Sequence, residues 1–331
     1  MKALTRQLLN DFQRDFPLSP EPFESIAREL QTSGDVVLEQ LKALQVKGVV
    51  SRVGPVFRPN TIGVSTLAAM AVPAAELEQV AAVVNDFPQV NHNYEREHRY
   101  NLWFVATAGD RHTLERTLTE ITERTGRDVM SLPLLKDYHI DLGFHMSLER
   151  QSRLAELPDM PLDANDAQEA QGSTGTAEDL IEAIQCGLPL VSRPYREIAR
   201  RLGWSEVEVI EALRDMLSNG TIKRLGVVVR HHELGYRANA MVVWDVPDEQ
   251  VDRLGRLLGD QDCVTLSYQR PRRQPDWPYN LFCMVHGRDR GEVIACIERM
   301  AAALDIGDIA HEVLFSGRRF RQRGARYRAR C

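Results

Sequence analysis

The stretch PFESIARELQ at residues 22–31 recurs later in the same chain as PYREIARRLG at residues 194–203. A shift of 172 residues aligns residues 22–68 with residues 194–240, and 16 of these 47 pairs are identical. Identity over this length indicates a tandem duplication, so we expect the two halves of the chain to share one fold.

Each copy begins with two segments of helical apolar spacing, followed by a short apolar strand. A proline stands early in the first segment, and Gly48 or Gly220 follows the second. The order helix, turn, helix, strand predicts a winged helix-turn-helix. The wing strands are expected at residues 49–59 and 222–230.

The remainder of each copy reads strand, helix, two strands, helix, strand, which is the order of a ferredoxin-like βαββαβ module. Within the strand pair, YNLWFV at residue 100 matches YNLFCM at residue 279. The predicted fold class is therefore α+β, a tandem duplication in which each half is a winged helix-turn-helix followed by a ferredoxin-like module. We expect the halves to form an intramolecular pseudo-dimer.

A linker between the copies is indicated by residues 158–179, which are rich in Pro, Gly, Ser, Ala and acidic residues and contain no aromatic residue. Such a tether keeps the halves at high effective concentration. Association of whole chains into a homo-oligomer stays open. The predicted domains are winged helices at 1–65 and 183–237, AsnC-type ferredoxin-like modules at 66–150 and 238–331, and an acidic flexible linker at 151–182.

The composition is that of an ordinary globular protein, with 43% hydrophobic and 27% charged residues and a net charge of −6. The first residues include acids and lack the apolar core of a signal peptide, and no run approaches the length of a membrane span. The five cysteines are odd in number and lack C-x-x-C spacing, which argues against a disulfide framework and a structural zinc site. We therefore expect a cytoplasmic protein that does not associate with a membrane.

The C-terminal segment GRRFRQRGARYRARC, residues 317–331, carries seven arginines. It is either a solvated terminus or a cationic arm that holds an anionic ligand, and the sequence favours neither.

Reactive side chains are concentrated in NHNYEREHRYNLWF, residues 91–104. Strand alternation predicts that one face carries His92, Tyr94, Arg96 and His98. The absence of a nearby cysteine and the six-residue spacing of the histidines argue against a zinc site. Two imidazoles, a phenol and a guanidinium on one face favour an anionic ligand.

The equivalent hairpin of copy two keeps the tyrosine and the first arginine as Tyr268 and Arg270, but replaces both histidines. It adds Arg272 and Arg273, whose guanidinium groups suit bidentate contacts with carboxylates. If the two hairpins face each other, they could enclose a large, flat polycarboxylate.

A winged helix followed by a small α/β module resembles the leucine-responsive/AsnC regulators, in which the second module binds a small effector. The segment at the recognition-helix position of copy two carries carboxylates at Glu206, Glu208 and Glu211, which DNA phosphates would repel. Arg52 and Arg224 could contact a DNA backbone, but two positions do not form a footprint. We therefore expect no sequence-specific DNA binding.

The hairpins HNYEREHRYNLWF and YQRPRRQPDWPYNLFCMVHG resemble those of the siroheme decarboxylases, AsnC/Lrp-like proteins, in their fused NirDL form. The resemblance covers nearly the whole chain. It implies removal of carbon dioxide from the C12 and C18 acetates of siroheme, giving 12,18-didecarboxysiroheme in haem d1 biosynthesis. It also implies that tetrapyrroles of this pathway bind, that siroheme is the substrate, and that no cofactor is required. The alternatives are a haem-responsive transcriptional regulator and a non-catalytic tetrapyrrole carrier.

Under this hypothesis, His92 and His98 share proton donation to the substrate, and either could make an axial contact with its iron. The protein holds no metal of its own. Arg58 and Arg230 follow the wing strands and could equally form structural ion pairs. The expected carboxylate anchors are Tyr94, Arg96, Arg52, Arg58, Arg224, Arg230, Tyr268, Arg270, Arg272 and Arg273.

Overall fold

The computed structural model describes residues 2–58, 60–140, 176–229 and 238–324. These residues form two compact units, and each unit takes one domain from each copy. The first unit contains both helical domains and the second contains both sheet domains. Equivalent domains are thus paired, which confirms the predicted intramolecular pseudo-dimer.

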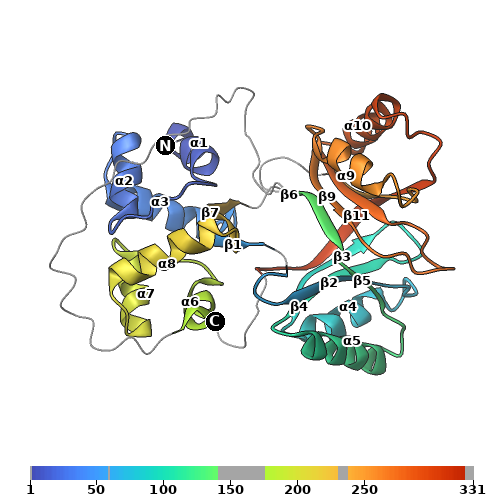
Figure 1. Ribbon diagram of the computed structural model, residues 1–331, viewed down its shortest axis with the longest axis horizontal. Coiled ribbons are helices and arrows are strands. Elements are labelled where there is room, and N and C mark those ends of the chain that lie inside the picture. The colour runs from blue at the N-terminus through green and yellow to red at the C-terminus, as the bar shows by residue number, and fades with distance from the viewer. Residues whose placement is uncertain (1, 59, 141–175, 230–237, 325–331) are drawn as a thin grey trace. The chain divides into compact units, whose positions relative to one another are not determined.

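The first unit contains two three-helix domains, each followed by one strand (Figure 1). Pro22 and Pro194 occupy the first helical positions of α2 and α7, and Gly48 and Gly220 follow α3 and α8 with φ values of 75° and 77°. These residues confirm the predicted helix ends. The elements are α1 (Lys2–Asp11), α2 (Pro22–Glu29), α3 (Gly34–Val46), β1 (Val50–Phe57), α6 (Ala177–Ile184), α7 (Pro194–Leu202), α8 (Glu206–Ser218) and β7 (Ile222–Val229).

One additional helix, α1 or α6, precedes each predicted pair. Helix α6 begins at Ala177, after a capping box between Thr176 and Asp179. The predicted linker at 151–182 is therefore too long at its C-terminal end, because capping residues are as polar as linker residues. Its residues 151–175 lie outside the described part of the chain.

Both predicted wing strands are present as β1 and β7, and they pair with each other in antiparallel orientation to form one two-stranded ribbon. Gly54 pairs with Gly226, its equivalent in the repeat, which gives the ribbon pseudo-two-fold symmetry. A Cβ on Gly226 would overlap the carbonyl oxygen of Gln13, and one on Gly54 would lie 2.8 Å from the Cα of Gly187. Each glycine therefore admits the backbone of the other copy.

One apolar core serves both halves of the first unit. Backbone hydrogen bonds also join the two copies. The N–H of Leu188 donates to the carbonyl oxygen of Val53 at 2.7 Å, and the N–H of Phe16 donates to the carbonyl oxygen of Leu225 at 3.2 Å. The two helical domains thus fold as one body.

In the second unit, the predicted order of strands and helices is confirmed in both copies, except that the last strand of copy one is divided in two. The elements of copy one are β2 (Val64–Met70), α4 (Leu77–Asp86), β3 (Val90–Arg96), β4 (Leu102–Ala108), α5 (Arg111–Thr125), β5 (Met130–Pro133) and β6 (Lys136–Ile140). Those of copy two are β8 (Ala238–Trp244), α9 (Val251–Gly259), β9 (Val264–Gln269), β10 (Leu281–Gly287), α10 (Arg290–Ala303) and β11 (His311–Gln322).

The strands of the second unit form one sheet in the order β5-β2-β4-β3-β11-β8-β10-β9-β6. Strand β6 of copy one pairs with β9 of copy two, and β11 of copy two pairs with both β8 and β3. Because β5 and β6 are adjacent in the chain yet stand at opposite ends of this order, the sheet must curve back on itself. Each copy therefore ends in a strand that joins the sheet of the other copy.

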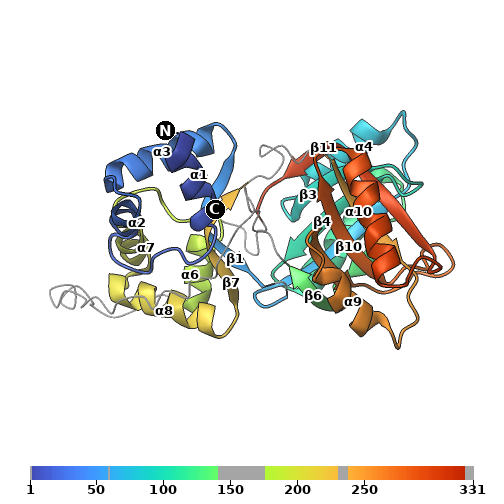
Figure 2. The ribbon, with the colours of Figure 1, turned by 90° about the horizontal axis from the view of Figure 1, so that it is seen from above.

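Helices α4 and α5 lie on one side of these strands, and α9 and α10 lie on the opposite side (Figures 1 and 2). Each helix pair closes an apolar core of its own copy. The other face of each half-sheet contributes to a shared core that includes Trp103, Tyr268, Trp277, Phe282 and Leu314. We call this shared side the inner face, and it is the side on which residues of both copies meet.

The described part of the arginine-rich segment fastens copy two to copy one. Arg318 forms an ion pair with Glu95 at 2.7 Å, while Arg321 and Arg323 donate to the carbonyl oxygen of Val90 at 3.3 and 3.2 Å. These arginines therefore continue the strand exchange of β11. The tail beyond residue 324 lies outside the described residues.

Cys263 and Cys296 form a disulfide, contrary to the argument from cysteine number and spacing. The two residues are 33 positions apart and meet through the packing of α10, which local spacing does not reveal. Cys283 is a free, buried thiol.

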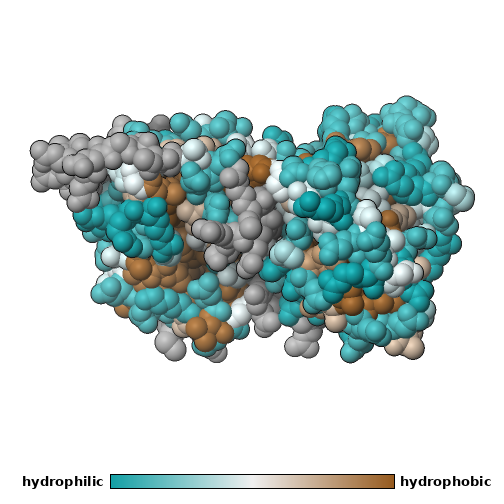
Figure 3. All heavy atoms as spheres, turned by 90° about the horizontal axis from the view of Figure 1, so that it is seen from below, coloured by the Kyte–Doolittle hydropathy of each residue, from teal (hydrophilic) through white to brown (hydrophobic). Residues whose placement is uncertain are grey.

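The helices in the described ranges are all too short or too polar to cross a membrane. The face drawn in Figure 3 is mostly hydrophilic over the described residues, with apolar patches between.

Candidate active site

The inner face of β3 carries His92, Tyr94 and Arg96, as the alternation predicts. Their neighbours point to the helix side: the Asn93 side chain donates to the carbonyl oxygen of Ala81 in α4 at 3.2 Å. The rings of His92 and Tyr94 are stacked, with centroids 6.2 Å apart. One strand therefore presents an imidazole, a phenol and a guanidinium to the shared interior.

Arg96 is buried, with 8% of its surface exposed. Its Nη1 donates to the carbonyl oxygen of Leu314 at 3.0 Å and to the hydroxyl of Ser316 at 2.9 Å, both in copy two. Burial lowers its pKa to about 10. Within the described residues its buried Nε has no hydrogen-bond partner, so this guanidinium has donor capacity left for a ligand.

Arg270, the equivalent of Arg96, makes the matching contact in the other direction. Its Nη1 donates to the carbonyl oxygen of Leu132 in copy one, and its guanidinium lies over the Tyr268 ring, 4.7 Å from the centroid. Burial also lowers its pKa. The two arginines thus form a pseudo-symmetric pair that ties the copies together.

His98 follows β3 in the turn before β4, where both of its ring nitrogens are hydrogen-bonded. Its Nδ1 accepts from the backbone N–H of Tyr100 at 2.9 Å, and its Nε2 lies 2.7 Å from Oε2 of Glu312 in copy two. An acceptor at Nδ1 requires the proton of the neutral ring to be on Nε2. The pKa of His98 is lowered, chiefly by burial, while the Glu312 charge acts in the opposite direction.

Aromatic rings surround His98. The Trp277 ring meets it edge-on at 5.6 Å, and the Tyr100 ring stacks on it at 5.9 Å. Trp277 and Trp103 are both fully buried, with centroids 5.2 Å apart. The imidazole is therefore held between rings from both copies.

Arg272, which replaces His98 in copy two, faces its own copy. It donates to Asp245 at 2.8 Å and also pairs with Asp248. The Nε of Arg273 donates to the carbonyl oxygen of Ser131 in copy one at 2.9 Å. To bind a carboxylate of a ligand, Arg272 would have to release one of these aspartates.

The remaining predicted anchors belong to the first unit. Arg52 donates to the carbonyl oxygen of Pro55 at 3.0 Å, and Arg58 is exposed after β1. Arg224 is buried and donates to the carbonyl oxygen of Gln13. Arg230 lies outside the described residues.

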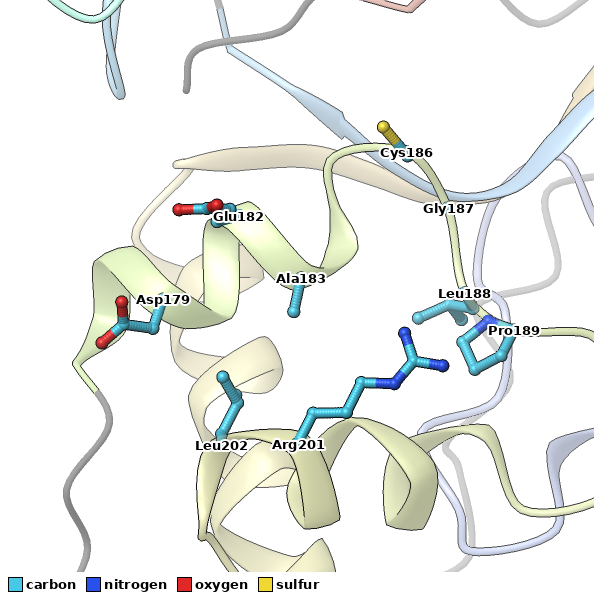
Figure 4. A pocket seen from close by; sticks show the side chains of 9 residues that line it. All are labelled: Asp179, Glu182, Ala183, Cys186, Gly187, Leu188, Pro189, Arg201 and Leu202. Carbon is cyan, nitrogen blue, oxygen red and sulfur yellow. The ribbon is translucent and has the colours of Figure 1, made fainter. Parts of the chain in front are cut away.

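A hollow of about 680 Å³ in the first unit is bounded by α6, α7 and the loop between them (Figure 4). Its charged lining consists of Asp179, Glu182 and Arg201, and Arg201 is paired with Glu197 at 3.0 Å. Carboxylates of this kind would repel a polycarboxylate ligand, so this hollow does not suit the predicted ligand, whereas the inner face of the second unit gathers the predicted arginines and tyrosines. No cluster of three or more His, Cys, Asp or Glu side chains suited to a metal ion occurs among the described residues.

Family models match both kinds of domain in both copies. An AsnC-like ligand-binding domain matches residues 61–139 and 233–321, and a siroheme decarboxylase NirDL-like HTH domain matches residues 5–50 and 178–222. The siroheme decarboxylase NirDL subunit of Paracoccus denitrificans is 41% identical over 325 residues, covering 98% of this chain and 97% of that subunit. The chain belongs to the siroheme decarboxylase NirDL family.

Two further comparisons agree with membership of the NirDL family. The siroheme decarboxylase NirD subunit of Stutzerimonas stutzeri is 52% identical over 142 residues, covering 43% of this chain and 93% of that subunit. A crystal structure of the siroheme decarboxylase NirDL in co-complex with an iron-uroporphyrin III analogue has a TM-score of 0.67 and 28% identity, covering 98% of this chain and 94% of that one. The predicted fold and family resemblance are confirmed.

The sequence argument did not identify Glu312 as part of this NirDL-type site. Glu312 lies 214 positions after His98 in the chain and reaches it only because β11 crosses into copy one. The usable signal was the single acid in HEVLFSG, which stands two positions before the buried Leu314 and therefore on the same side of β11.

Proposed function

We propose that the chain is a siroheme decarboxylase, a carboxy-lyase that removes carbon dioxide from the C12 and C18 acetates of siroheme and yields 12,18-didecarboxysiroheme in haem d1 biosynthesis. Similarity to a NirDL subunit over 98% of the chain carries the proposal. The co-complex of the related NirDL with an iron-uroporphyrin III analogue supports a tetrapyrrole ligand. Siroheme is the substrate, and we propose no additional cofactor.

The chemistry requires few groups from the protein. Loss of carbon dioxide from a ring acetate leaves an electron pair on the methylene carbon, which the macrocycle can delocalise until a proton arrives. A site accelerates this step if it holds the other carboxylates firmly and stabilises the developing charge better than the departing carboxylate. A positioned acid that supplies the proton contributes further.

We assign the proton-donating role to His98 and the axial contact with the substrate iron to His92. His98 is suited to proton transfer because a carboxylate holds its Nε2 side. His92 lies on the inner face, stacked on Tyr94. The proposed carboxylate anchors on this face are Tyr94, Arg96, Tyr268 and Arg270, with Arg272 and Arg273 on the hairpin of copy two.

Arg224 is withdrawn from the set of anchors because it is buried against Gln13 in the first unit. The proposed location is the cytoplasm, and other tetrapyrroles of the pathway are proposed ligands. Further association into a homo-oligomer is compatible with this function. DNA is not among the proposed partners, because α8 exposes the carboxylates of Glu211 and Asp215, which DNA phosphates would repel.

The direct test is anaerobic incubation of the purified full-length chain with siroheme, followed by mass analysis of the tetrapyrrole. We expect the product to have lost the mass of two carbon dioxide molecules. Siroheme that stays bound but unchanged would indicate a carrier, and siroheme that does not bind would contradict the assignment altogether.

A further inference from the structure

We propose that Glu312, supplied by copy two and supported by Tyr279, is the positioning residue that holds the Nε2–H of His98 and returns protons to it. The inference rests on the proposed function, because it concerns the histidine assigned to proton donation. It makes the acid of copy one dependent on a carboxylate of copy two.

The contact geometry leaves His98 a single neutral tautomer. The backbone N–H of Tyr100 points at Nδ1 from 2.9 Å, so this nitrogen must accept. Nε2 therefore carries the proton and donates it to Oε2 of Glu312 across 2.7 Å. The second oxygen of Glu312 accepts from the hydroxyl of Tyr279 at 2.9 Å, which fixes the carboxylate in turn.

Neighbouring groups restrict the imidazole to this orientation. Trp277 and Tyr100 bound its ring, and the indole of Trp277 is fully buried. The remaining charges nearby are Arg99, which pairs with Asp276 at 2.6 Å, and Asp245, whose charge helps to raise the pKa of Tyr279. Of these groups, Glu312 is the carboxylate that directly contacts the imidazole.

Exposure indicates how the pair exchanges protons. The His98 side chain is 13% exposed, whereas that of Glu312 is 42% exposed. Solvent therefore reaches the carboxylate more readily than the imidazole. Glu312 connects the enclosed ring to bulk water.

The proton balance of decarboxylation requires such a connection. In each step the bond between the acetate methylene and its carboxylate breaks, carbon dioxide leaves, and the electron pair stays on the methylene carbon. That carbon takes the proton that Nε2 of His98 shares with Glu312 and becomes a methyl group. Solvent then restores the proton through Glu312, so two decarboxylations consume two protons and need no redox partner.

The pseudo-symmetric equivalents of His98 and Glu312 do not form such a pair. Leu132 and Leu314 are equivalent, because they accept from the equivalent residues Arg270 and Arg96. Two positions earlier, Met130 stands where copy two has Glu312. The position of His98 is likewise taken by a residue of another type, so the described residues hold a single pair of this kind.

The kinetic test compares Glu312→Gln and Tyr279→Phe with Glu97→Gln in the full-length chain. Glu97 is a matched control because it neighbours His98 and also pairs across the copies, with Arg290 at 2.7 Å. We expect Glu312→Gln to lower kcat on the order of 100-fold with little change in KM. It should also move the pH dependence of kcat to lower pH, because the charge that raises the pKa of His98 is lost. Tyr279→Phe should have a smaller effect, and Glu97→Gln none.

A second measurement is independent of turnover. In siroheme-free protein labelled with ¹⁵N-histidine, the signals of His98, identified with His98→Gln, should show a bare Nδ1 and a protonated Nε2. In Glu312→Leu, Tyr100 should still keep Nδ1 as an acceptor, but a pH titration of the same signals should give a lower pKa of His98, because the charge of Glu312 that raises it is lost. A wild-type chain without decarboxylase activity would refute the proposed function alone. Unchanged kcat and pH dependence in Glu312→Gln, or an unchanged pKa of His98 in Glu312→Leu, would overturn the positioning role.

Discussion

The two hairpins of the second unit descend from one sequence but have opposite partners. In copy one, His98 crosses to Glu312 of copy two. In copy two, Arg272 turns back to Asp245 and Asp248 of its own copy. Equivalent positions of the two hairpins thus differ in partner: the imidazole contacts the other copy, and the guanidinium is paired within its own copy. Arg96 and Arg270, by contrast, make symmetric contacts with the carbonyl oxygens of Leu314 and Leu132.

The largest effect is expected from His98→Ala, which removes the group that distinguishes the active hairpin. We predict a fall in decarboxylation of about 100- to 1000-fold, because general acid catalysis contributes on this order. Binding of siroheme, followed by its absorbance, should persist. Decarboxylation at the wild-type rate would place the proton donor elsewhere.

Gly226→Ala tests another pair of equivalents, Gly54 and Gly226. A methyl group at Gly226 would overlap the Gln13 backbone, so we expect the free energy of unfolding to fall by about 2 to 3 kcal/mol. Gly54→Ala should cost less, because its nearest backbone atom lies 2.8 Å from the added carbon. Urea unfolding measures both, and equal losses would contradict the asymmetry of these contacts.

The symmetric arginines should respond alike in stability. Arg96→Met and Arg270→Met each remove a charged donor to a carbonyl of the other copy, so each should cost about 2 kcal/mol. Thermal unfolding provides the comparison. If Arg96→Met leaves stability intact but weakens siroheme binding, its contact with Leu314 is secondary to its role as an anchor.

Arg272→His places a histidine in the second hairpin without a matching acid at Met130. We expect no gain in turnover and a loss of about 1 kcal/mol from the partly exposed pairs with Asp245 and Asp248. Decarboxylation rates and urea unfolding of this variant are the measurements. The double variant Arg272→His, Met130→Glu would then show whether the lack of a carboxylate at position 130 prevents the gain in turnover.

The smallest effect concerns pH. Because burial lowers the pKa of His98, the unfolded state binds more protons once the pH falls below about 6.5. The stabilisation of the neutral ring is fully present above that pH and is lost as the pH falls through the folded pKa. Relative to His98→Gln, the wild type should therefore lose stability on acidification in urea titrations. A constant difference would contradict the lowered pKa.

Helical periodicity and strand alternation in the sequence were sufficient to predict part of this structure. Periodicity located the helices that begin at Pro22 and Pro194, and alternation placed His92, Tyr94 and Arg96 on one face. Pairings between copies were not predictable in this way, because neither the β1–β7 ribbon nor the contact of Glu312 with His98 has a short-range signature. Arg272 illustrates the limit: its charge suggested a ligand anchor, but two aspartates of its own copy engage it.

Because the copies exchange their terminal strands, the sheet can close only after the last strand has been synthesised. Strand β3 of copy one has β11 as one of its neighbours, and β11 (His311–Gln322) is the last strand of the sheet to leave the ribosome. Until then the first module exposes an unpaired strand edge, which is a template for wrong association. Chains translated in close succession could therefore exchange β11 with one another before each closes its own sheet.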